Sequence, residues 1–293
     1  APAFTTSAGE ADAENVEPEV IRMPLRDAAF KHRSKQKTPF IYSACVAKPI
    51  TRKEWKHIPK AVEAMDKEWN KLRALRCWDE DAVMDFKELR KKEWGKTIHV
   101  ARIFDICVIK NSELPEGHDL RKYKGRVVFE GCNVKDEKNN WAIFSEIASC
   151  PATMEAGKAC DAIGLVERNA VECADGESAY TQAELKGAPT WIRIGDRDRW
   201  PASWFHPDGT CKYEDPVCPL RLALYGHPDA GGFWEEHCEE RLTRPEVGFV
   251  PIKNWRSCFW HPVLKLFLVV YVDDFKMAGP TANLKVAWDR IAS

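Results

Sequence analysis

The sequence lacks several features that would assign a protein to a broad class at once. No apolar run approaches the ~20 residues of a membrane span, and no signal peptide opens the chain, so no membrane partner is expected. The formal net charge of the 293 residues is −1, so a nucleic-acid binder of this sequence would need local basic patches. The 11 cysteines contain no Cys-x-x-Cys pair, and their irregular spacing favours reduced thiols over a disulfide framework or a zinc site.

The composition that is present divides the chain into three parts. Residues 1–50 are acidic and then basic without a sustained period, which predicts a disordered linker. Residues 51–95 predict a helical segment, with one helix over residues 58–78 and a second one that Asp79 can cap. Residues 96–293 carry both strand and helix patterns, and the 44% hydrophobic content of the chain is sufficient for a sizeable core.

The most specific chemistry lies in residues 266–278. Residues 266–270 form an apolar run short enough for a buried strand, and the sequence Tyr-Val-Asp-Asp follows at residues 271–274. Two adjacent carboxylates at the tip of a buried hairpin repel each other and lose solvation unless a cation neutralises them. A hard divalent ion such as Mg²⁺ suits oxygen ligands of this kind, although Asp-Asp by itself is more often a polar turn. Thr281 is expected to cap the helix that follows.

A second group of candidates is cationic. Residues 98–110 and 124–131 predict two strands joined by a turn, and residues 190–194 predict a further short strand. The hairpin would bring together five cations, which suit a triphosphate or a template backbone: Lys110, Arg121, Lys122, Lys124 and Arg126. Ordinary surface lysines are the alternative that this pattern leaves open.

Two further candidates are Asp175, which stands before a glycine, and Gly226, which stands before a predicted helix. An amphipathic helix is predicted over residues 153–165, with an apolar stripe that includes Met154 and Leu165. Asp175 follows it and stands before a glycine, which by itself is a turn dipeptide. Gly226 precedes a predicted helix that runs to about residue 244, and a glycine there either allows the backbone to approach a nucleotide closely or makes a strand-to-helix turn.

Taken together, these spaced blocks resemble reverse transcriptases, in particular the copia-type branch of LTR retrotransposons. Residues 271–274 are similar to the catalytic hairpin, and Asp175 and Tyr180 are similar to a palm-strand aspartate and the aromatic residue five positions on. Residues 124–128 resemble the Lys-Ala-Arg-Leu-Val pattern of the fingers hairpin. The block Leu-Tyr-Gly-Leu-Lys-Gln-Ala-x-x-x-Trp is matched at Leu224, Tyr225, Gly226, Ala230 and Trp234. The sequence departs from the family at Gly125, Gly176, Glu177, Pro228 and Asp229.

The resemblance implies an α+β fold, the fingers and palm of a right-hand polymerase in residues 96–293, with an antiparallel palm sheet and the thumb missing. It implies that Asp175, Asp273 and Asp274 are catalytic and hold two Mg²⁺ ions, for which Mn²⁺ is an alternative. Implied substrate contacts are Tyr180 as the sugar gate, Arg126 and Lys124 at the triphosphate, Gly226 at the base pair, and Tyr271. Implied partners are an RNA or DNA template with its primer, deoxynucleoside triphosphates, and the remainder of a Pol polyprotein with integrase and RNase H. The implied location of the protein is a cytoplasmic virus-like particle or the nucleus.

Two alternatives to an active polymerase stay open on the sequence. Because the chain begins at Ala1 and ends at Ser293 inside a helical pattern, we expect a piece of a longer polyprotein that binds primer–template weakly, and a catalytically inactive transposon remnant fits the same features. A metal-dependent nuclease or phosphatase also uses clustered carboxylates, but it would need neither Tyr180 nor the basic hairpin. The polymerase hypothesis requires the carboxyls of Asp175 and Asp273 to lie within reach of one metal ion, at the edge of a shared sheet.

Overall fold

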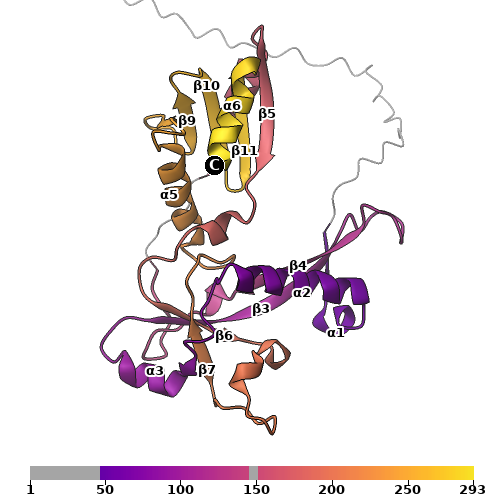
Figure 1. The fold of residues 1–293 in the computed structure, drawn as a ribbon, viewed down its shortest axis with the longest axis vertical. Coiled ribbons are helices and arrows are strands. Elements are labelled where there is room, and N and C mark those ends of the chain that lie inside the picture. Colours follow the sequence, from indigo (N-terminus) through magenta and orange to yellow (C-terminus); the bar gives the residue numbers. More distant parts are fainter. Residues whose placement is uncertain (1–46, 145–150) are drawn as a thin grey trace, which may run out of the picture. The chain divides into compact units, whose positions relative to one another are not determined.

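The computed structural model describes residues 47–144 and 151–293, which form an α+β fold built on two sheets (Figure 1). The predicted linker over residues 1–50 lies almost entirely outside the described residues. Its last three residues are different, because Lys48–Ile50 forms strand β1 and pairs with residues 107–109. In the part of the chain that the structure describes, no helix is long and apolar enough to cross a membrane.

The first sheet has six strands and is mixed. Its order is β1-β3-β6-β7-β2, with β4 paired to β3, and every described pairing is antiparallel except β3 with β6. The strands after β1 are β2 (Met84–Asp85), β3 (His99–Lys110), β4 (Lys122–Phe129), β6 (Thr190–Ile194) and β7 (Pro216–Pro219). The predicted hairpin over residues 98–131 and the strand over residues 190–194 are therefore confirmed.

Three helices accompany this sheet: α1 (Arg52–Trp55), α2 (Pro59–Ala74) and α3 (Phe86–Lys92). Helix α2 begins at a proline, which suits the first helical position, and buries one stripe consisting of Ala61, Met65, Trp69 and Leu72. It packs so closely on β4 that a Cβ on Gly125 would lie 2.6 Å from the Met65 Sδ atom. Glycine at position 125 therefore has a local cause in helix packing.

The prediction that Asp79 caps the second helix is wrong. Helix α3 begins only at Phe86, with Asp85 at its N-cap position, because the preceding residues pair with β7 instead. Leu89 of this helix is fully buried, whereas Trp94 lies beyond the helix end and is 70% exposed. Because α3 ends at Lys92, the Trp94 ring does not join the buried face of the helix.

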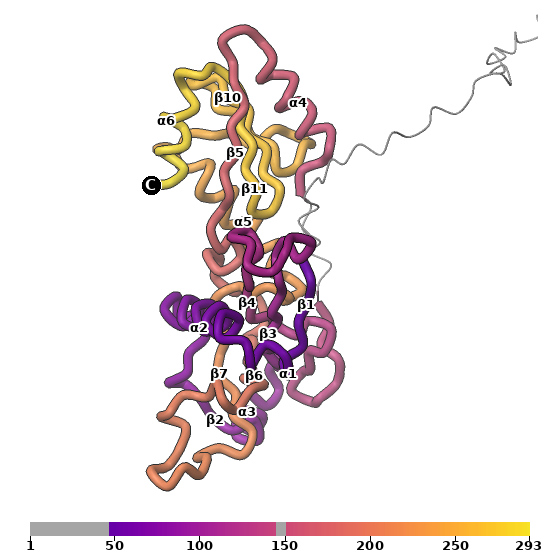
Figure 2. The backbone as a smooth tube through the Cα atoms, turned by 90° about the vertical axis from the view of Figure 1, so that its right-hand side faces the viewer, coloured from indigo at the N-terminus to yellow at the C-terminus, as the bar shows by residue number. Residues whose placement is uncertain are grey.

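The second sheet has five strands, all antiparallel, in the order β5-β11-β10-β9-β8. The strands are β5 (Asn169–Asp175), β8 (Val250–Pro251), β9 (Cys258–His261), β10 (Leu266–Tyr271) and β11 (Asp274–Pro280). Helices α4 (Met154–Gly164) and α6 (Thr281–Ala292) lie on opposite faces of this sheet (Figure 2). Helix α5 (Ala230–Leu242) shares the α6 face, as its buried Trp234 and Cys238 show.

Burial on both faces explains the apolar run in β10. Leu266, Leu268 and Val270 pack toward α5 and α6, whereas Phe267 and Val269 pack toward α4. A strand covered on both sides has no solvent-facing position for a polar side chain, so it reads as a continuous hydrophobic segment. The buried strand predicted over residues 266–270 is confirmed.

Two details of the predicted helices are wrong. Met154 and Leu165 are 75% and 87% exposed, because α4 turns a face of smaller residues, including Ala156 and Cys160, toward the sheet. Thr281 is already inside α6 and its hydroxyl donates to the Arg168 carbonyl at 3.1 Å, so it ties the helix to a loop and does not cap it. The remaining short elements are 3₁₀ turns at Gly131–Asn133, Ala179–Gln182 (η2), Arg197–Arg199 and Ala202–Trp204.

Candidate functional site

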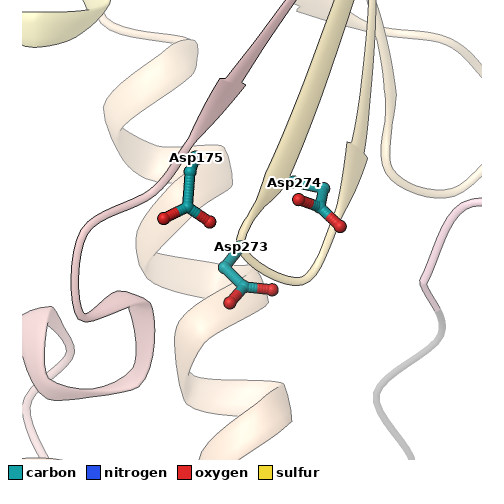
Figure 3. Close-up of side chains that lie close together, drawn as sticks. All are labelled: Asp175, Asp273 and Asp274. Carbon is teal, nitrogen blue, oxygen red and sulfur yellow. The ribbon is translucent and has the colours of Figure 1, made fainter. Parts of the chain in front are cut away.

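Three aspartates gather at one end of the five-stranded sheet (Figure 3). Asp175 is the last residue of β5 and lies directly opposite Asp274, the first residue of β11, while Asp273 occupies the hairpin turn. One carboxylate oxygen of each lies within 4.8 Å of the others, as the polymerase hypothesis requires. Tyr271 pairs with Asp274 across the hairpin, so its side chain shares the sheet face of Asp274 and Asp175.

The chemistry of this cluster fits a hard divalent cation. Like charges directly opposite each other on adjacent strands are destabilising, and a cation would relieve that repulsion. Asp175 and Asp274 are exposed and Asp273 is half-buried, so positions around a bound ion would stay open to water or substrate oxygens. Exposed acidic groups also gather without a metal, and the metal-binding role of these residues therefore stays a prediction.

The turn that carries Asp273 is held in a strained conformation. Val272 has a φ of 57°, in the left-handed region that β-branched residues rarely adopt, at a cost on the order of 1–3 kcal/mol. Its carbonyl accepts a 2.7 Å hydrogen bond from the Trp234 indole N–H of α5. On the other side, the Gly176 N–H donates to the Asp273 carbonyl at 2.6 Å. A Cβ on Gly176 would lie 3.1 Å from the Phe275 ring, so glycine at this position permits close packing of the end of β5 on the hairpin.

Tyr180 lies beside this aspartate cluster. It belongs to η2, whose Ala179 is buried in the core of the five-stranded sheet. The ring is half-buried, and its centroid lies 4.7 Å from that of Tyr225. Burial raises the pKa of the Tyr180 phenol, and coupling to the adjacent Tyr225 phenol and the negative charge of Asp273 act in the same direction. Its location fits the predicted sugar gate, a role that remains a prediction.

The cationic candidates divide into two groups. Lys124 and Arg126 share one face of β4, and the pKa of Lys124 is lowered by burial and by the neighbouring charges of Arg126 and Lys110. Arg121 instead donates to a backbone carbonyl of the connecting loop at 2.7 Å, and Lys122 is exposed at the start of the strand. The structure therefore brings Lys110, Lys122, Lys124 and Arg126 together, because Lys122 pairs directly with Lys110 across the hairpin. Arg121 stabilises the loop instead.

Gly226 has a structural reason to be glycine. Its φ is +90°, and a Cβ at this position would lie 2.2 Å from the Phe129 carbonyl oxygen of β4. The Phe129 N–H donates to the Tyr225 carbonyl at 2.8 Å, so residues 225 and 226 are docked on the end of β4. Contact of Gly226 with a base pair stays a prediction, because the close backbone approach that the glycine permits is to β4.

Sequence reasoning missed two charged residues of α2. Glu68 is half-buried near Lys71, Arg126 and Lys124, and burial raises the pKa of its carboxyl against the opposing effect of these cations. Lys71 forms a 3.0 Å salt bridge with Glu177, two residues beyond Asp175 in the chain. The helical period assigns both residues to the outward face of α2, and nothing in the sequence indicates that this face meets the candidate site.

No protein-family model matches the chain, and no curated protein is significantly similar to it. The resemblance to reverse transcriptases therefore rests on the spaced sequence blocks.

Proposed function

We propose that this chain is the reverse transcriptase part of a copia-type retrotransposon polyprotein. In this proposal the five-stranded antiparallel sheet with α4, α5 and α6 is the palm, and the β3–β4 hairpin with α2 is the fingers. The single observation that carries the proposal is the convergence of Asp175, Asp273 and Asp274 at one sheet end. Tyr180, five positions after Asp175 as in the family, lies beside them and packs against Tyr225, whose ring lies under the Arg126 guanidinium. A cluster of acidic residues alone would not explain this arrangement.

The proposed reaction is attack of a primer 3′-hydroxyl on the α-phosphorus of a deoxynucleoside triphosphate, with release of pyrophosphate. When bound by the three aspartates, two Mg²⁺ ions would lower the pKa of the attacking hydroxyl and stabilise the leaving pyrophosphate. Arg126 and Lys124 would neutralise and orient the triphosphate through charge-assisted hydrogen bonds. The Tyr180 ring would pack under the sugar and exclude a ribose 2′-hydroxyl.

The test is incorporation of a single nucleotide into a labelled primer annealed to an RNA or a DNA template, with and without Mg²⁺. We expect Mg²⁺-dependent incorporation that falls by at least about a hundredfold in Asp273→Asn, because the metal site loses a charged ligand. Asp289→Asn is the matched control, since Asp289 is an aspartate of α6 that pairs with Lys285 on the same helix.

Three other outcomes of this experiment would contradict the proposal. Degradation of the primer or template without consumption of triphosphates would favour a metal-dependent nuclease. The absence of both activities in a folded protein would favour a catalytically inactive remnant. Equal incorporation by the wild-type protein and by Asp273→Asn would contradict the proposed site.

A further inference from the structure

Tyr225 has no role in the reaction proposed above. The backbone here is docked on β4 through the 2.8 Å hydrogen bond from Phe129, and Gly226 allows the close approach. These contacts involve only main-chain atoms of residue 225. The position of the backbone is therefore set independently of the Tyr225 side chain. The reason for a tyrosine ring at this position must come from the groups that the ring contacts.

The ring contacts one group from each sheet. The guanidinium carbon of Arg126, on β4 of the six-stranded sheet, lies 5.0 Å from the Tyr225 centroid. The Tyr180 ring, which follows β5 of the five-stranded sheet, lies 4.7 Å away at an interplanar angle of 59°. Tyr225 thus links the residue proposed to hold the triphosphate with the residue proposed to select the sugar.

The electrostatic setting suits a neutral ring that supports a cation. Burial raises the pKa of the Tyr225 phenol, the charge of Arg126 and its hydrogen bond to the phenol oppose this effect, and the charge of Asp273 adds to it. A neutral aromatic face attracts a guanidinium group. Among the described residues Arg126 forms no direct salt bridge, and its charge acts on the half-buried Glu68 carboxyl only through space.

We propose, on the basis of the proposed function, that Tyr225 is a positioning residue for the incoming nucleotide. Its ring orients Arg126 toward the triphosphate and supports the Tyr180 ring against the sugar. Affinity for the triphosphate and selection against ribonucleotides are then coupled through one side chain. A substitution that removes the aromatic face weakens both properties together, although residue 225 does not take part in the chemistry.

The experiment compares Tyr225→Leu, Tyr225→Phe, Arg126→Gln and the Tyr225→Leu/Arg126→Gln double variant in single-nucleotide primer extension. We expect Tyr225→Leu to raise the KM for the deoxynucleoside triphosphate about three- to tenfold, with a smaller change in kcat. The ratio of deoxyribonucleotide to ribonucleotide incorporation should fall in the same variant. Tyr225→Phe should restore most of the sugar selectivity and part of the KM, because the aromatic face remains while the phenol oxygen that Arg126 approaches is lost. In the Arg126→Gln background, Tyr225→Leu should raise the KM little further.

Tyr213→Leu is the matched control, because it removes a tyrosine ring that packs on Trp204 and has no aromatic or cationic contact with Arg126 or Tyr180. If Tyr225→Leu unfolds, Tyr225→Met replaces it, since methionine fills similar space without an aromatic face. An active wild-type enzyme whose KM and sugar selectivity are unchanged by these variants would overturn the inference and leave the proposed function intact. Additive effects of the Arg126 and Tyr225 substitutions would also overturn it. A folded wild-type protein that incorporates no nucleotide would overturn the proposed function and this inference with it.

Discussion

The two sheets carry charged side chains in different ways. In the five-stranded sheet, β10 is buried from Leu266 to Val270, and its polar chemistry is confined to the hairpin end. In the six-stranded sheet, β4 alternates buried and half-buried residues, so cations stand along the strand at every second position. A strand covered on both faces can place charges only where it ends, whereas a strand covered on one face can line them up.

This difference explains why the two candidate groups have different geometries. The aspartates converge because three strand termini and a turn meet at one end of a sheet. Lys124 and Arg126 are near each other because they are two residues apart on one face. The carboxylates therefore form a compact cluster suited to a small ion, and the cations form an extended surface suited to a chain of phosphates.

The largest expected effect tests how tightly the six-stranded sheet is covered by α2. Gly125→Ala should destabilise the protein by about 2–3 kcal/mol, because the new Cβ would overlap Met65 and force the helix away from β4. Gly157→Ala is the matched control: it lies inside α4 with no heavy atom within 4 Å of a new Cβ, so it should be neutral or stabilising. Chemical denaturation of the two variants measures both effects. Equal stability of the two would show that α2 does not pack closely against residue 125.

A smaller effect tests the carboxylate cluster itself. Without divalent cations, Asp175→Asn should stabilise the protein by about 0.5–1 kcal/mol, because it removes a negative charge directly opposite Asp274. With saturating Mg²⁺, the wild-type protein should gain stability and the variant should gain little, since only the wild type keeps all three ligands. Thermal unfolding with and without Mg²⁺ measures this reversal. If Mg²⁺ stabilises both proteins equally, the metal binds elsewhere.

The smallest expected effect concerns Glu68, the carboxylate that faces the cationic strand. Its pKa is raised above the ordinary 4.5, chiefly by burial, so the folded protein binds this proton more tightly than the unfolded chain does. Stability should therefore decline as pH rises from below 4.5 through the folded-state pKa. Glu68→Gln should remove that decline and stabilise the protein at neutral pH by less than about 1 kcal/mol. Urea denaturation at several pH values provides the measurement, and a decline of unchanged size in the variant would assign it to another group.

Local periodicity predicted much of the fold because its physical cause is local. The apolar stripe of α2 predicts a helix whose observed bounds are Pro59–Ala74, and the strand predicted at Thr190–Ile194 has the observed bounds. The pattern failed at helix α4, where Met154 and Leu165 are exposed. Small residues pack that helix closer to the sheet than large ones would, and a hydropathy pattern weights large residues more heavily.

By itself, the sequence determined the residue types and spacing of the candidate site: an Asp-Asp pair after a buried strand, an aspartate with a tyrosine five positions on, and two cations on one strand face. Only the tertiary structure decided that Asp175 stands opposite Asp274, because strand register depends on partners far apart in the chain. It also brought Tyr225 between Arg126 and Tyr180, a contact that joins two sheets and leaves no periodic signal in the sequence.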